Sequence, residues 1–115
     1  YRLRRVTHEY REVFTRLDVV LSPVLTHTTP AIGHLSPTLP FEELFPRLQA
    51  YVGFTPLNNA SGGPAISLPL GATANGLPIG CHLAADLGDE RTLLELAFEL
   101  EAAKPWSRIR DAAAG

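Results

Sequence analysis

The residue whose setting most suggests a nucleophile is Ser61, within the stretch NNASGGPAISLPLG of residues 58–71. Many hydrolases expose a catalytic serine on a Gly-x-Ser-x-Gly turn that leads from a strand into a helix. Here Asn59 replaces the first glycine, and the alternating apolar residues after the turn predict a strand instead of a helix. The pattern therefore favours a framework turn, in which the small residues let two backbone segments approach closely.

A lysine base is the second chemistry to consider, and Lys104 is the single lysine in the chain. In a Ser-x-x-Lys arrangement a serine would stand three residues earlier, but that position is Glu101. Lys104 instead falls in the last turn of a predicted helix, where a positive charge stabilises the helix dipole. The sequence thus offers no lysine suited to activate a serine.

Histidine and cysteine give no stronger candidates. The four histidines, at positions 8, 27, 34 and 82, lack the spacing of a metal site, and we expect His8 to be a solvated helix residue. Cys81 and His82 are neighbours on a predicted strand, so their side chains point to opposite faces and cannot form a thiolate–imidazole pair. We predict no catalytic residue and no metal ligand in this chain.

The loop THTT, residues 26–29, is the stretch with the most varied polar side chains. A hydroxyl-rich loop that follows a strand can line a pocket, and it can equally satisfy its own turns. Both interpretations stay open from the residues alone.

Periodicity predicts the elements of the first half. Apolar residues at intervals of three and four predict an amphipathic helix over 2–17, and an apolar strand follows at 18–23. Four prolines and no clear period predict an irregular loop over 23–40. A second helical stretch, FEELFPRLQAYV, contains Pro46, which kinks it or divides it into two short helices.

The second half predicts β-structure and a closing helix. Strands over 65–71 and 76–85 flank Asn75-Gly76, which suits a type I′ hairpin turn in which both central residues have positive φ. A helix follows from about 89 to 104. Asp86 or Asp89 caps its start, an Arg91–Glu95 pair supports it, and Pro105 ends it; its apolar face is unusually broad.

Composition narrows the class of protein. The 115 residues form at most one domain, with 45% hydrophobic residues and a formal charge of −2, which argues against nucleic-acid or membrane binding. No apolar run approaches the roughly 20 residues that cross a bilayer. A single cysteine cannot form an internal disulfide, which fits a reducing, cytoplasmic location.

The predicted strands carry few charges on either face, as strands do when both faces of a sheet are covered. Two long helices and a broken one are thin cover for such a sheet. We therefore expect a fragment of a larger protein or an obligate assembly.

The order of segments resembles the C-terminal part of amidase signature enzymes, from about residue 18 to residue 106. The matching segments are DVVLSP, VLTHTTPAIG, FTPLNNASGGPAISLPLG, NGLPIGCHLAA and GDERTLLELAFELEAAKPW. Their most specific element is Asn59-x-x-Gly62-x-Pro64-Ala65-x-Ser67-x-Pro69-x-Gly71, followed by Gly76-Leu77-Pro78-x-Gly80.

The resemblance implies an α/β fold, namely part of a mixed-sheet α/β/α architecture with about three strands and flanking helices. Residues 1–115 would be a C-terminal fragment whose partner is the remainder of an amidase chain. The family hydrolyses small-molecule carboxamides with two serines and a lysine and needs no cofactor; those groups lie N-terminal to the matched region. The loop 26–29 would contribute to the pocket wall, with Thr28 and Thr29 as candidate substrate-binding residues.

Two positions depart from the family. His82 stands where glutamine is common, so the hydrogen bonds of that amide are remade or lost. Val52 stands where relatives that use glutamine as ammonia donor carry aspartate, which favours a less polar amide.

We expect the 115-residue chain to be inactive alone. The alternative is a non-enzymatic binding module, a stand-alone descendant of the amidase fold, and a homo-oligomer is compatible with either interpretation. A third hypothesis is a small hydrolase in which Ser61 works with a histidine.

Overall fold

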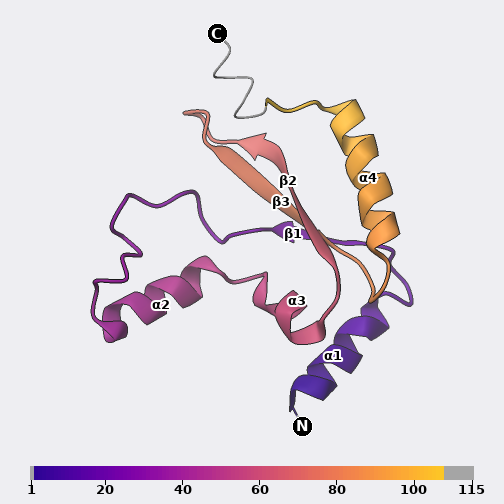
Figure 1. The fold of residues 1–115 in the computed structure, drawn as a ribbon, viewed down its shortest axis with the longest axis horizontal. Helices are drawn as coiled ribbons and strands as arrows, with labels where there is room; N and C mark the ends of the chain where they lie inside the picture. Colours follow the sequence, from indigo (N-terminus) through magenta and orange to yellow (C-terminus); the bar gives the residue numbers. More distant parts are fainter. Residues whose placement is uncertain (1, 108–115) are drawn as a thin grey trace.

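A computed structural model describes residues 2–107 of the chain (Figure 1). The elements follow one another as α1 (Arg2–Val13), β1 (Val20–Pro23), α2 (Phe41–Tyr51), α3 (Pro56–Ser61), β2 (Ala65–Ala72), β3 (Pro78–Ala84) and α4 (Glu90–Ala103).

The three strands form one sheet in the order β1-β3-β2, and both pairs are antiparallel. The central strand β3 therefore joins two segments far apart in sequence: His82 lies opposite Ser22 on one side and Ser67 on the other. The expected α/β class, with about three strands and flanking helices, is confirmed. The parallel pairs that a mixed sheet requires do not occur among the described strands.

The hairpin between β2 and β3 is confirmed, but its predicted type I′ turn is wrong. The amide of Gly76 donates to the Thr73 carbonyl at 2.9 Å, and the amide of Thr73 donates to the Leu77 carbonyl at 2.8 Å. Gly76 has φ +83°, whereas Asn75 does not have a positive φ. This is a type I turn closed by a left-handed glycine, a three-residue loop that also matches the twist of the strands.

The core lies between the hairpin and α4. Leu68, Leu83, Ala85 and Leu93 are buried together, and the apolar side of α4 packs around them. Contact with the sheet uses only part of the broad apolar face of α4, because Leu94 and Phe98 on the same helix stay exposed.

The predicted closing helix is confirmed to within a residue at each end. Asp89, not Asp86, is the N-cap, and its carboxylate accepts from the Thr92 amide at 3.4 Å and hydroxyl at 2.8 Å. Asp86 instead accepts from Arg11, on α1, at 3.0 Å. The predicted Arg91–Glu95 pair forms, at 2.6 Å.

The other helices differ from the sequence-based expectation in length. α1 ends at Val13, four residues early, and the chain continues in tight turns. α2 runs without a break through Pro46. The helix α3 was not predicted, although Pro56 occupies its first turn, a position that suits proline because no helical amide bond is needed there.

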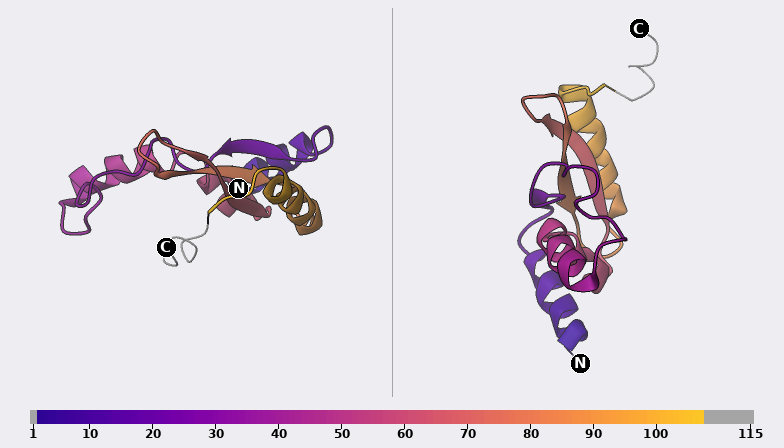
Figure 2. Two further views of the ribbon diagram at one scale, coloured as in Figure 1. Left: turned by 90° about the horizontal axis from the view of Figure 1, so that it is seen from above. Right: turned by 90° about the vertical axis from the view of Figure 1, so that its left-hand side faces the viewer.

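The molecule is thin and spread out, with extents of 45 × 44 × 20 Å (Figure 2). Its radius of gyration is 16.7 Å, against about 13 Å expected for a compact domain of this size. Many large apolar side chains are exposed, including Leu21 at 66% on the edge strand β1. The expectation of thin cover over the sheet is therefore met. Within the described residues no helix is both long and apolar enough to span a bilayer.

Candidate functional site

The loop after β1 and the start of β3 enclose a pocket of about 240 Å³. Its lining residues run from Pro23 to Thr29 on one side and from Pro78 to Gly80 on the other. Both threonines predicted to contact substrate, Thr28 and Thr29, lie in this wall. Whether they bind a ligand stays a prediction, but they do line the same hollow.

Pairing between β1 and β3 creates this pocket. The loop leaves the strand with the amide of Val24 donating to the Gly80 carbonyl at 3.3 Å, which holds its first residue against β3. The sequence analysis identified the threonine loop but missed its opposite wall, Pro78–Gly80. The GLPIG segment was recognised as a motif. It lies some fifty residues after the threonine loop, so nothing in the sequence indicated that the two segments are in contact.

The described lining of this pocket contains no charged side chain; besides proline and aliphatic groups it offers threonine hydroxyls and the His27 ring. Such a surface can hold a small uncharged molecule and orient it with hydroxyl hydrogen bonds. None of the described serines lies in this wall. The pocket can therefore bind, while any reacting group would have to come from elsewhere.

Ser61 ends α3 with only 8% of its surface exposed. Its hydroxyl donates to the Asn58 carbonyl and accepts from the Gly63 amide, both at 3.3 Å. These bonds close the turn between α3 and β2, as the framework interpretation expects. The hypothesis of a Ser61–histidine pair finds no support, since no histidine bonds to this hydroxyl among the described residues.

His82 is buried, with 7% of its surface exposed, and its Nδ1 lies 3.3 Å from the Ser22 hydroxyl. Burial lowers the pKa of the imidazole below its usual value, so the neutral ring is favoured. The ring thus keeps a hydrogen bond where glutamine is common in the family. Cys81 is paired with Pro23 and Leu68, on the opposite face of the strand, as expected.

Lys104 does not act on the helix end alone. Its ammonium group donates to the carbonyl of Leu70 at 2.9 Å and so connects the end of α4 to β2. This contact is additional to the predicted interaction with the helix dipole, which stays a prediction, and no serine takes part in it.

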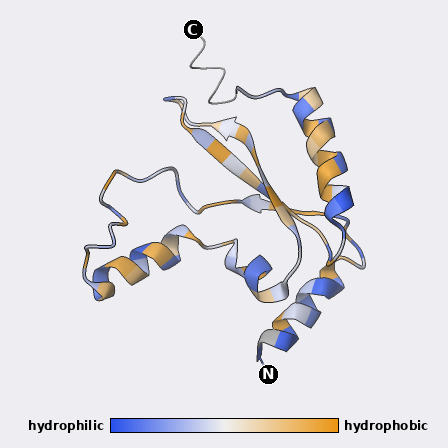
Figure 3. Ribbon diagram, in the orientation of Figure 1, coloured by the Kyte–Doolittle hydropathy of each residue, from blue (hydrophilic) through white to orange (hydrophobic). Residues whose placement is uncertain are grey.

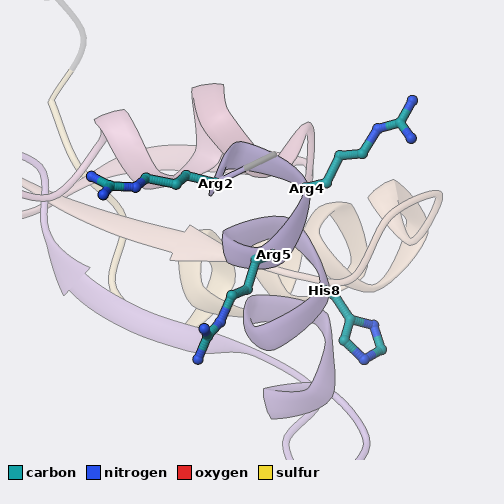
Figure 4. Close-up of a pocket in the computed structure, with 4 residues that line it drawn as sticks. All are labelled: Arg2, Arg4, Arg5 and His8. Atoms are coloured by element: carbon teal, nitrogen blue, oxygen red, sulfur yellow. The ribbon is translucent and has the colours of Figure 1, made fainter.

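A larger hollow, of about 630 Å³, lies beside α1. Among the described residues it is lined by Arg2, Arg4, Arg5 and His8, whose side chains point in different directions (Figure 4). Arg5 already pairs with Glu9 at 2.6 Å, and His8 is exposed as expected. Because these side chains do not converge, the described part of the lining shows no arrangement that would bind a ligand. The described residues also contain no group of three or more potential metal ligands.

Comparison with known proteins gives a consistent result. The sequence model of the family described as Amidase matches residues 1–94. A protein of Mycobacterium leprae provisionally named amidase AmiC is 50% identical over 109 residues, which cover 95% of this chain and 23% of that protein. The 6-aminohexanoate-cyclic-dimer hydrolase of Paenarthrobacter ureafaciens is 40% identical over 96 residues, 77% of this chain and 19% of the hydrolase.

Solved structures agree with the sequence matches. The structure of a 6-aminohexanoate cyclic dimer hydrolase complexed with substrate superimposes with a TM-score of 0.79 at 37% identity, over 90% of this chain and 23% of that one. A glutamyl-tRNA(Gln) amidotransferase chain from Thermotoga maritima gives 0.70 at 26% identity, over 92% and 22%. The chain thus spans about a quarter or less of the length of these relatives.

Proposed function

The chain belongs to the amidase family, and from this premise we propose that it is the C-terminal part of a longer amidase that hydrolyses a carboxamide to a carboxylic acid and ammonia or an amine. In this protein the 115 residues build late strands of the sheet and one wall of the substrate pocket. The parent enzyme works in the cytoplasm and the segment is inactive alone.

One observation carries the proposal. Almost the whole chain superimposes on a hydrolase bound to its substrate, while only 23% of that hydrolase is matched. A thin sheet with exposed apolar faces is the form expected of such a segment, because in a larger fold other layers would cover those faces.

The mechanism divides between the two parts of the proposed enzyme. A serine of the remainder attacks the amide carbonyl, a second serine and a lysine move the proton to the leaving nitrogen, and water hydrolyses the acyl-enzyme. Thr28 and Thr29 contribute by contact with the bound amide, since a hydroxyl both donates to a carbonyl and accepts from an N–H. Their task is orientation and not proton transfer.

The substrate class follows from the character of the wall. The lining around Thr28 and Thr29 is uncharged, and Val52, half-buried at the end of α2, offers no carboxylate to an α-amino group. An uncharged or weakly polar amide suits this wall better than glutamine does, because the described lining offers no charged side chain to pair with an α-amino or α-carboxylate group.

The test uses the complete polypeptide encoded by the gene, assayed for release of ammonia or amine from neutral aliphatic, aromatic and cyclic amides and from glutamine. We expect turnover of neutral amides by the complete polypeptide and none by the 115 residues alone. Thr28→Val and Thr29→Val should each raise KM by roughly fivefold, the worth of one hydrogen bond. Thr38→Val is the matched control, since Thr38 lies in the same loop but outside the pocket wall.

The binding-module alternative rests on the exposed apolar surface, which includes Leu21, Phe41 and Phe98. It predicts a different outcome of the same experiment: a reading frame that starts near Tyr1, no amide turnover, and a stable complex with another protein. Amide turnover by a longer polypeptide rules it out.

A further inference from the structure

We propose that Thr26 is a positioning residue of the pocket, which fixes the Thr28–Thr29 wall by tying its loop to the C-terminal end of α2. The inference rests on the proposed function for its catalytic consequence. Thr26 itself lies in the wall, two residues before Thr28.

The tie is made by hydrogen bonds to the end of the helix. The last carbonyls of an α-helix have no partner within the helix. The Thr26 amide donates to the Tyr51 carbonyl at 3.1 Å, and the Thr26 hydroxyl bridges the carbonyls of Ala50 and Tyr51. One residue of the loop thus supplies two donors to a helix end 24 and 25 residues away in sequence.

Close packing adds to these bonds. A Cβ on Gly53 would lie 2.6 Å from the Thr26 methyl group, so only glycine leaves room for the threonine. The next loop residue, His27, places its ring 4.7 Å from the ring of Tyr51, and its Nδ1 lies 2.8 Å from the Thr28 carbonyl. The contact therefore extends from Thr26 to the backbone of Thr28.

Few other contacts attach the loop to α2; one is the bond that the Arg47 guanidinium donates to the His34 carbonyl at 2.9 Å. α2 has no buried residue, so no core fixes the helix or the loop that precedes it. Toward the sheet the loop is held by the bond from Val24 to Gly80. Figure 1 shows this loop running from β1 to α2. The Val24 bond attaches its wall segment to β3, and Thr26 attaches it to the end of α2.

The experiment compares Thr26→Val with Thr26→Ser in the complete polypeptide. Valine keeps the shape but loses the hydroxyl donor, whereas serine keeps the donor and loses only the methyl group. We expect Thr26→Val to raise KM for a neutral amide by roughly fivefold with kcat within about twofold, and Thr26→Ser to restore the parental KM. Thr38→Val, outside the wall, should leave both constants unchanged.

A double-mutant cycle tests the packing. Gly53→Ala should raise KM in the parent, because the new methyl collides with that of Thr26, but should be nearly neutral in Thr26→Ser, where the colliding group is gone. If the two substitutions only lowered stability, their effects on KM would add. A smaller effect of Gly53→Ala in Thr26→Ser than in the parent therefore supports the proposed contact.

Hydrogen exchange of residues 24–29 gives a readout that does not depend on activity. Thr26→Val should speed exchange of this segment by about tenfold while β2 and β3 keep the parental rates. Unchanged exchange, or a Thr26→Ser variant as impaired as Thr26→Val, overturns the positioning role. If the complete polypeptide turns over no amide but Thr26→Val still speeds exchange of residues 24–29, the proposed function is wrong and the positioning role of Thr26 is supported.

Discussion

The half formed by the three strands and α4 differs sharply from the arm of residues 24–55, which contains the loop and α2. The strands and α4 bury Leu68, Leu83 and Leu93 in a common core. The arm carries apolar residues too, several of them along α2 (Figure 3). α2 nevertheless buries none of its residues, and Ile32 in the loop is fully exposed.

The difference shows that the residues that stabilise the fold and those that line the candidate pocket lie in different parts of the chain. The core of the sheet and α4 gains the free energy of apolar burial, and this half can act as a scaffold. The arm carries the candidate pocket wall and is held by a few hydrogen bonds, as loops that bind ligands commonly are. Its apolar residues gain burial only when another part of a larger protein covers them.

The largest effect should come from a cavity in the core. Leu93 is 3% exposed, and Leu93→Ala should lower the free energy of unfolding of the 115-residue chain by about 3 kcal/mol, because the transfer energy is lost and a void remains. Urea unfolding monitored by circular dichroism measures the change.

The matched variant in the arm is Ile32→Ala. Since Ile32 is fully exposed, the free energy of unfolding of the same chain should change by less than about 0.5 kcal/mol. In a longer amidase that covers the arm, the cost should rise. If Leu93→Ala and Ile32→Ala lowered the free energy of unfolding of the short chain equally, the proposed difference in burial between the two halves would be wrong.

A smaller effect should follow from removing the cap of α4. Asp89→Ala leaves the Thr92 amide without its acceptor and should cost about 1 kcal/mol, measured by thermal unfolding. Asp89→Asn keeps an acceptor oxygen and is the control. A null result for alanine would mean that burial alone holds this end of the helix.

The smallest effect concerns pH and His82. Because burial lowers the pKa of the folded imidazole, the unfolded chain binds the proton more readily, so this contribution to stability is complete above about pH 6.5 and is lost as the pH falls. Unfolding midpoints measured at about pH 7.5 and about pH 5, on either side of the unfolded histidine's pKa, give the change.

His82→Gln supplies the reference for this comparison, since glutamine does not titrate. The midpoint of the parent should fall more between the two pH values than that of the variant. A larger fall in the variant would show that other groups dominate the acid response.

Local features could be predicted from sequence because their causes lie within a few residues. The α4 boundaries, the Arg91–Glu95 pair and the hairpin position came from periodicity and turn residues. The turn type was wrong because Asn-Gly fits both a two-residue and a three-residue loop, and register decides between them. The short helix α3 lacked a full period and was missed.

By itself the sequence determined the three strands, the closing helix, the threonine loop as a candidate and the kinship with amidases, since each depends on residue types at short spacing. Only the tertiary structure decided that β3 is central, that Pro78–Gly80 lines the pocket with the threonines and that Thr26 meets the end of α2. Those contacts join segments some 25 to 60 residues apart, and no local pattern encodes them because their energy appears only when the distant partners meet.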